Sequence, residues 1–244
     1  MKKERIDKLL VELGFVESRT RAQALIMAGD VIVNDHAIKK AGDLVAPDAT
    51  IRLRGEALPF VSRGGLKLQH ALDHFAIDVT SLLALDVGAS TGGFTDCLLQ
   101  RGAAKVCALD VGHNQLAWKV RNDPRVVVIE GYNARNLRRE DLPFLPTLVT
   151  CDVSFISQTL ILPRIKAVAA PGAIVVTLVK PQFEVSREDV GKGGVVRDPQ
   201  KRQGAIDRCV AIVAELGAKL RGVEPSPILG PAGNVEFLLV ANLP

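Results

Sequence analysis

Apolar residues in the first 55 positions follow a helical spacing and then a strand spacing. Ile6, Leu9, Leu10 and Leu13 stand at i, i+3, i+4 and i+7, the pattern of an amphipathic helix that Gly14 would end. A second helix is expected from Ser18 to Gly29. Short strands are then predicted over residues 31–33, 43–45 and 51–53. This order predicts a small α+β domain.

From residue 60 onward, short apolar runs alternate with helical stretches. A late helix is predicted to begin at Asp198, with Pro199 in its first turn, and to end at Gly217. Strand–helix alternation predicts an α/β domain, in which a parallel sheet is covered by helices on both faces. The strands are predicted at residues 82–87, 105–110, 125–129, 148–152, 173–179 and, last, 235–241.

Net charge and cysteine content say less about the function than the positions of the charged residues do. The chain has 244 residues and a net charge of +4, and residues 1–56 hold 10 Lys and Arg against 9 Asp and Glu. An anionic partner therefore has to be argued from where the charges lie. The four cysteines form no CxxC pair, and no histidine stands at metal-ligand spacing from them. We expect buried thiols in a cytoplasmic protein, with neither a disulfide framework nor a bound metal.

The hydropathy pattern argues against a membrane protein. No apolar run follows the basic N-terminus, so it does not fit a signal peptide. The most apolar stretch, residues 167–179, is broken by Pro171 and Gly172 and is shorter than the roughly 20 residues of a spanning helix.

Basic side chains surround the two N-terminal helices. Arginines at the start of the second helix would lie beside outward-facing backbone N–H groups, a combination that suits phosphate oxygens. The simpler alternative is that these charges only solvate a small domain. Because the chain has one Trp and one Tyr, we do not expect bases to stack on aromatic side chains as the main binding mode. We expect structured RNA that is bound through its backbone and shape. The candidate RNA-binding residues are Arg5, Lys8, Arg19, Arg21, Lys39 and Lys40.

Segments 5–10, 18–22 and 28–34 resemble the S4 RNA-binding domain, over about residues 1–60. The resemblance favours RNA binding over mere solvation. We expect this domain and its linker to occupy residues 1–59, with the linker itself at 55–59. That linker carries no Trp, which leaves any coupling of the two domains through it open.

A glycine-rich turn, DVGASTGGFTD at residues 86–96, joins the first strand of the larger domain to a helix. Such a turn lets a ligand approach the backbone and the helix N-terminus. Ser90 stands where a dinucleotide fingerprint requires glycine. Asp110 ends the next strand, where an acidic side chain accepts hydrogen bonds from ribose hydroxyls. An ordinary turn with a solvated Asp is the alternative.

Four polar residues stand in apolar or glycine-rich surroundings: Lys67, Asp152, Lys180 and Glu236. Ligands of open α/β sheets bind beyond the carboxyl ends of the parallel strands, so Asp152 and Lys180 should meet there. Glu236 can join them only if the last strand runs antiparallel to its neighbours. Strand-end ion pairs are the alternative, although clustered charges at such ends favour function.

The glycine-rich turn resembles motif I of class I methyltransferases, and the Lys-Asp-Lys-Glu set resembles the FtsJ-like ribose 2′-O-methyltransferases. With the S4-like domain, all 244 residues resemble the TlyA, or haemolysin A, family of ribosomal RNA methyltransferases, notably at SRGGLKL, CDVSFIS and VKPQFE. The resemblance implies S-adenosylmethionine as cofactor and ribosomal RNA or ribosomal subunits as partner. It implies a Rossmann-like domain over 60–244, with a mostly parallel seven-stranded sheet whose last strand is antiparallel. The cofactor contacts it implies are Asp86, Gly88, Ala89, Ser90, Thr91, Gly92, Gly93, Phe94, Asp110 and Asp152.

A ribose hydroxyl is a poor nucleophile until a base within hydrogen-bond reach takes its proton. Our hypothesis makes Lys180 this base and Lys67 the group that steers the hydroxyl, with Asp152 and Glu236 positioning the lysines. The site then has to favour a neutral amine, which burial and nearby positive charge do, although the two carboxylates act in the opposite direction and push the pKa of the lysine upward.

Four other interpretations stay open at this point. They are a non-catalytic RNA-binding protein in ribosome assembly, a haemolysin, a base-nitrogen methyltransferase and a C5-pyrimidine methyltransferase using Cys151. Methyltransferases that act on base nitrogens carry a motif resembling Asn-Pro-Pro-Tyr or Asp-Pro-Pro-Tyr at the fourth strand, whereas this chain has Cys-Asp-Val-Ser there. Strand alternation points Cys151 away from the face that Asp152 would use. The run 191–194 with Arg197 would form a basic loop over RNA or a solvated one. The modified nucleotide and the oligomeric state are left open.

Overall fold

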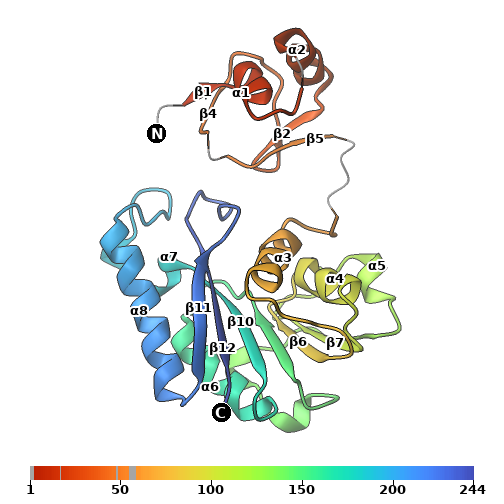
Figure 1. Cartoon of the computed structure of the whole chain (residues 1–244), viewed down its shortest axis with the longest axis vertical. Coiled ribbons are helices and arrows are strands. Elements are labelled where there is room, and N and C mark those ends of the chain that lie inside the picture. The colour runs from red at the N-terminus through yellow and green to blue at the C-terminus, as the bar shows by residue number, and fades with distance from the viewer. Residues whose placement is uncertain (1–2, 17, 48, 55–58) are drawn as a thin grey trace. The chain divides into compact units, whose positions relative to one another are not determined.

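The computed structural model describes residues 3–16, 18–47, 49–54 and 59–244 (Figure 1). The chain divides into two compact units. The smaller comprises Met1–Leu58 with Ile228–Gly233, and the larger comprises Pro59–Pro227 with Asn234–Pro244. Residues 55–58 of the expected linker lie outside the described part of the chain. The inclusion of residues 228–233 in the smaller unit has no counterpart in the sequence-based prediction.

The smaller unit consists of two helices and two small antiparallel sheets. Helix α1 spans Ile6–Glu12 and α2 spans Arg19–Ala28. Ser18 caps α2 by accepting a hydrogen bond from the Arg21 backbone N–H, and Gly29 ends it with a φ of 77°. The strands pair as β1–β4 and as β3–β2–β5, and are β1 (Glu4–Arg5), β2 (Val31–Val33), β3 (His36–Ala37), β4 (Leu44–Val45) and β5 (Ile51–Leu53).

The predicted apolar face of α1 forms the core of this unit. Ile6, Leu10 and Ile26 are fully buried and pack with the strand residues Val31 and Val45. The α+β prediction is therefore confirmed, while the two-residue strands β1 and β3 are too short to carry a periodic signal.

The larger unit is built on a seven-stranded sheet in the order β11-β12-β10-β9-β6-β7-β8. Neighbouring strands are parallel except at β12, which runs antiparallel to both β10 and β11. This confirms the predicted sheet with an antiparallel last strand. The strands are β6 (Leu83–Val87), β7 (Lys105–Leu109), β8 (Val126–Ile129), β9 (Leu148–Cys151), β10 (Ile174–Val179), β11 (Lys219–Pro225) and β12 (Phe237–Asn242).

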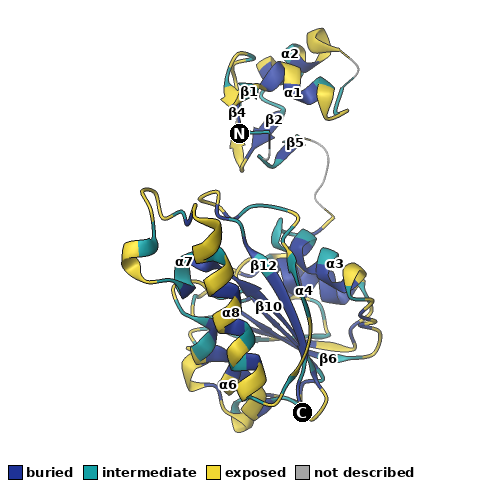
Figure 2. Ribbon diagram, turned by 60° about the vertical axis from the view of Figure 1, so that its left-hand side comes forward, coloured by how far each residue is buried: buried dark blue, intermediate teal, exposed yellow. Residues whose placement is uncertain are grey.

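Helices cover both faces of this sheet, and strand alternation decides which side chain meets which layer. Ala84 packs on the layer of α3, α4 and α5, whereas Leu85 packs on the layer of α6 and α8. Figure 2 shows the strands buried between helices whose outer sides are exposed. The helices are α3 (Gly64–His74), α4 (Gly93–Gln100), α5 (Trp118–Arg121), α6 (Gln158–Val168), α7 (Pro181–Glu184) and α8 (Pro199–Glu215).

The predicted boundaries of α8 are confirmed by its capping contacts. The Asp198 side chain accepts a hydrogen bond of 2.8 Å from the Gln200 backbone N–H, and Pro199 is the first helical residue. Gly217, with a φ of 68°, follows the last turn. Within the described residues, no helix combines the length and apolar character needed to cross a bilayer.

Candidate active site

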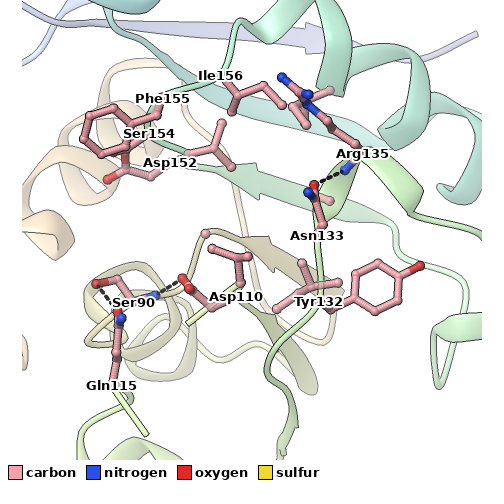
Figure 3. Close-up of a pocket in the computed structure, with 16 residues that line it drawn as sticks. Ser90, Asp110, Gln115, Tyr132, Asn133, Arg135, Asp152, Ser154, Phe155 and Ile156 are labelled. Carbon is pink, nitrogen blue, oxygen red and sulfur yellow. Dashed lines mark hydrogen bonds between the residues drawn. The ribbon is translucent and has the colours of Figure 1, made fainter. Parts of the chain in front are cut away.

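A pocket of about 460 Å³ opens at the carboxyl ends of the parallel strands (Figure 3). Four successive strand ends contribute to its lining: Gly88 follows β6, Asp110 follows β7, Asn133 follows β8 and Asp152 follows β9. This is where open α/β sheets bind their ligands. The pocket therefore lies where the sequence placed the cofactor site.

The turn after β6 approaches the end of β9 so closely that a side chain is excluded. A Cβ atom on Gly88 would lie 2.6 Å from the Asp152 carbonyl oxygen, and the φ of Gly88 is 85°. Gly92, with a φ of 94°, is the N-cap residue of α4. Gly88 thus brings bare backbone to the pocket wall.

Asp110 holds this turn in shape. One carboxylate oxygen accepts the Ser90 backbone N–H at 2.7 Å and the other accepts the Gly112 N–H at 2.7 Å. Each carboxylate oxygen has a second lone pair, so Asp110 retains capacity for a ligand hydroxyl. Ser90 has a φ of 47°, and its hydroxyl is 3.3 Å from the Gln115 side-chain oxygen.

Asp86 is fully buried and does not line the pocket. Its carboxylate accepts hydrogen bonds from the hydroxyls of Thr95 at 2.6 Å and Thr150 at 2.9 Å. Burial raises the pKa of Asp86 to about 6, against the opposing effect of the two threonine hydrogen bonds. Asp86 therefore ties β6 to α4 and β9 rather than facing the cavity.

The predicted cofactor residues divide into two groups. Gly88, Ser90, Asp110 and Asp152 line the pocket. The other six belong to the turn, the strand or the first turn of α4 without lining it, with Phe94 packed in the core; they are Asp86, Ala89, Thr91, Gly92, Gly93 and Phe94.

The four predicted catalytic residues lie in two ion pairs. Lys180 Nζ is 2.6 Å from Asp152 Oδ1, and Lys67 Nζ donates to Glu236 Oε2 at 2.5 Å. The Lys180 and Asp152 side chains are 10% and 21% exposed, whereas those of Lys67 and Glu236 are 6% and 1% exposed. The first pair lies at the edge of the pocket, because Asp152 lines it, and the second is more deeply buried.

The antiparallel direction of β12 explains how Glu236 reaches this edge of the sheet. Val179 pairs with Phe237 in the β10–β12 ladder. Lys180 follows this pair on one strand and Glu236 precedes it on the other, so the two residues lie at the same edge of the sheet. Lys67 comes from α3, and Lys180 directly precedes the first residue of α7. The Lys180 ammonium also donates to the Ser154 hydroxyl at 3.0 Å.

Several pocket residues have no counterpart in the sequence-based prediction. Asn133 follows β8, and its position at a third strand end is the signal that could have revealed it. Phe155 has a φ of 62° and is 88% exposed, with its ring 5.1 Å from that of Phe183. An apolar residue is normally expected inside, so its exposure could not be predicted. The other lining residues in this category include Gln115, Tyr132, Arg135 and Ser154.

The run 191–194 is tied to the segment that precedes β12. Gly191 bridges to Val195, and the buried Asn234 donates to the Gly194 carbonyl at 2.8 Å. Asn234 also accepts the Val196 backbone N–H at 3.0 Å. This loop is therefore anchored two residues before Glu236.

In the smaller unit, the buried carboxylate of Asp7 organises part of the predicted basic surface. It accepts two hydrogen bonds of 3.0 Å from Arg5, one of 2.8 Å from Arg19 and one of 3.0 Å from Gln23. These contacts, those of Arg5 first, hold the pKa of Asp7 well below its usual range. Both guanidinium groups remain about half exposed.

The remaining predicted RNA-binding residues are exposed as well. Lys8 lies between Glu4, at 3.4 Å, and Glu12, at 3.0 Å, on one face of α1. The side chains of Arg21, Lys39 and Lys40 are open to solvent.

Comparisons with known proteins place both units in described families. Residues 60–243 match the FtsJ-like methyltransferase family and residues 4–51 match the S4 domain. The chain is 47% identical over 239 residues to the 16S/23S rRNA (cytidine-2′-O)-methyltransferase TlyA of Mycobacterium tuberculosis, covering 98% of this chain and 89% of that protein. It is 43% identical over 235 residues to hemolysin A of Brachyspira hyodysenteriae, covering 96% and 98%.

Solved structures agree with this placement. A candidate hemolysin from Streptococcus thermophilus matches with a TM-score of 0.78 and 43% identity, covering 100% of this chain and 89% of the other. An O-methyltransferase from Bacillus cereus in complex with SAH shares the fold with a TM-score of 0.53. It has 16% identity and covers 78% and 85% of the two chains. The chain therefore belongs to the FtsJ-like methyltransferases, in the group that carries an S4 domain and includes TlyA and hemolysin A.

Proposed function

We propose that this protein transfers a methyl group from S-adenosylmethionine to a ribose 2′-hydroxyl of ribosomal RNA in the cytoplasm. The observation that carries the proposal is the Lys180–Asp152 pair, because Asp152 lines the pocket and lies 2.6 Å from the lysine. The relative TlyA is a 16S/23S rRNA (cytidine-2′-O)-methyltransferase by name, which supports RNA ribose as the substrate.

The pocket has the features that a nucleoside-containing methyl donor requires. Gly88 exposes backbone where a Cβ would collide, and Asp110 offers carboxylate lone pairs for ribose hydroxyls. Gly88, Ser90, Asp110 and Asp152 would hold the donor from the ends of three strands. The donor, when bound, supplies a methyl group on a sulfonium, an electrophile that needs an in-line nucleophile.

Lys180 is placed to prepare that nucleophile. Its Nζ is held by Asp152 and Ser154, so the amine is directed at the pocket edge. In the proposed step, the Lys180 ammonium first releases a proton to water. The neutral amine then takes the proton of the 2′-hydroxyl as the oxygen becomes the nucleophile, and the ammonium that results stays beside Asp152. Holding the amine in one position raises the rate because the reacting atoms are already aligned. Such alignment can lower the activation barrier by roughly 7–11 kcal/mol in favourable cases.

Lys67 and Glu236 have a positioning role in this proposal. Their pair is nearly inaccessible to solvent, and β12 fixes Glu236 beside the residue that follows β10. Lys67 steers the hydroxyl electrostatically, while Glu236 holds its ammonium. An unpaired ammonium in this setting would be costly, which explains why the two residues occur together.

The smaller unit, which contains the S4 domain, supplies the RNA affinity in this account. Arg5, Lys8, Arg19, Arg21, Lys39 and Lys40 are the residues that would contact phosphates. Asp7 fixes two of these guanidinium groups while leaving them accessible, which lowers the entropic cost of binding a phosphate.

The test is transfer of a labelled methyl group from S-adenosylmethionine to unmodified ribosomal subunits. The wild-type chain should transfer label to the RNA. The Asp110→Ala variant should lose donor binding and, as a consequence, the transfer of label. The exposed variant Glu140→Ala is the control and should label normally. Donor binding without transfer to either subunit would instead support a non-catalytic RNA-binding protein.

A further inference from the structure

The larger unit carries a cluster of possible metal ligands outside the pocket. His70 and His74 lie one turn apart on α3, and Glu224 lies on β11. Their nearest ligand atoms all lie within 4.8 Å of one another. Nε2 of His70 is 3.9 Å and Nε2 of His74 is 3.7 Å from the Glu224 carboxylate.

We propose that His70, His74 and Glu224 bind a zinc ion. Two histidines and a glutamate are an established ligand set for Zn²⁺, which leaves the fourth tetrahedral position for water or another ligand. Bonds of about 2.0–2.1 Å place tetrahedral ligand atoms about 3.3 Å apart, so small side-chain rotations close the cluster around an ion.

The second observation is an unsatisfied nitrogen. Nε2 of His70 is shielded from solvent and has no hydrogen-bond partner in the described part of the chain. A buried polar atom of this kind costs free energy unless something binds it, and a metal ion would. Neutral imidazole nitrogen is the form of histidine that binds metal ions.

The two elements are already fixed against each other beside the cluster. The Arg221 side chain donates to the Phe75 carbonyl at 2.5 Å, and a Cβ on Gly222 would lie 2.8 Å from the Phe75 ring. The Phe75 ring also packs edge-on against His74, with centroids 4.7 Å apart. The end of α3 and the edge strand β11 therefore hold the ligands in register.

A zinc ion here would join α3 to β11 near the methyltransferase site. Lys67 precedes His70 by three residues on α3, and the strand β11 leads to Ser226, whose N–H bonds the Glu236 carbonyl at 2.9 Å. Binding would stabilise the elements that carry the deeply buried ion pair. The site itself stands whether or not the chain methylates RNA.

The test measures Zn²⁺ binding to the untagged full chain by titration against a chromophoric chelator, with Co²⁺ as a spectroscopic probe. We expect one equivalent to bind and the thermal midpoint to rise with it. His74→Ala and Glu224→Gln should weaken binding by more than the roughly 10–100-fold that the loss of an outer-shell partner costs.

The matched control is His36→Ala, an exposed histidine of the smaller unit, which should bind Zn²⁺ as the wild type does. Circular dichroism checks that each variant is folded. Wild-type protein that takes up no zinc, or equal binding by the His74→Ala and Glu224→Gln variants, would overturn the proposal.

Discussion

The two units use buried charge in opposite ways. In the smaller unit, the buried Asp7 is surrounded by arginines that stay half exposed. In the larger unit, the buried cations Lys67 and Lys180 are each held by one carboxylate. An anion inside with cations outside leaves positive charge accessible to phosphate, as proposed for the smaller unit, whereas buried cations suit the catalytic roles proposed for the larger one.

Asp7 and Asp86, both fully buried, make the same contrast. Arginine contacts lower the pKa of Asp7, while burial raises that of Asp86, whose hydrogen-bond partners are the uncharged hydroxyls of Thr95 and Thr150. Burial alone therefore does not set the charge of a group; its partners do.

The largest effect is expected at Lys180. Lys180→Arg keeps a cation beside Asp152 but cannot accept a proton, so methylation should fall by about 10²–10⁴-fold. Donor affinity should change little. Methylation assays and donor titration measure the two quantities, with the exposed Lys105→Arg as the matched control. Near-normal methylation by Lys180→Arg would remove Lys180 as the base.

The more deeply buried pair, Lys67 and Glu236, should affect the free energy of unfolding. Lys67→Met leaves Glu236 unpaired and should lower the free energy of unfolding by about 3–5 kcal/mol. The double variant Lys67→Met, Glu236→Gln should recover most of this loss without recovering methylation. Urea denaturation gives the stabilities, and recovery of both properties together would reduce the pair to a structural role.

Asp86 should make the larger unit less stable as pH rises. Its folded-state pKa, about 6, exceeds the ordinary aspartate value, so the folded protein binds the extra proton. Relative to Asp86→Asn, the wild type should lose up to about 3 kcal/mol between pH 4 and 6 and stay level above. Urea midpoints across this range measure the difference, and parallel curves would contradict the assignment.

Asp7 should show the opposite pH dependence. Its pKa is lowered, so its contribution is present above the ordinary aspartate value, near pH 4, and disappears as the pH falls below it. Relative to Asp7→Asn, the wild type should therefore lose stability only in acid. Urea midpoints across the acid range measure the difference, with Glu140→Gln, at an exposed acid, as the control.

The smallest effect concerns the RNA contacts. Arg19→Ala should weaken RNA binding to a similar extent for different sequences and reduce the slope of log affinity against log salt by about one. Arg138→Ala, at an exposed arginine of the larger unit, should leave the slope unchanged. Filter binding at several salt concentrations distinguishes them, and an unchanged slope for Arg19→Ala would exclude that contact.

The sequence predicted those parts of the molecule that topology determines. Asp152, Lys180 and Asp110 follow apolar strands, and parallel strands end at one edge, so their proximity follows from the pattern. Glu236 needed one further condition, the antiparallel direction of β12, which the structure has.

Features that depend on tertiary neighbours could not be predicted. Strand β11 lies at the sheet edge and mixes Lys219, Arg221 and Glu224 with apolar residues, so it gave no periodic signal. The cluster formed by His70, His74 and Glu224 was missed with it. Asp7 stands in the first turn of α1, where an acid is normally solvated, but Arg19 and Gln23 of α2 contact its carboxylate, and this tertiary neighbour could not be predicted.

The position of the transferred methyl group tests the central proposal most directly. After incubation with methyl-labelled S-adenosylmethionine, the ribosomal RNA would be digested with alkali, which cleaves only where a 2′-hydroxyl is free. The account predicts label in alkali-resistant dinucleotides, and loss of that label in Lys180→Arg. Label in mononucleotides would show base methylation and contradict the roles proposed for Lys67, Asp152, Lys180 and Glu236.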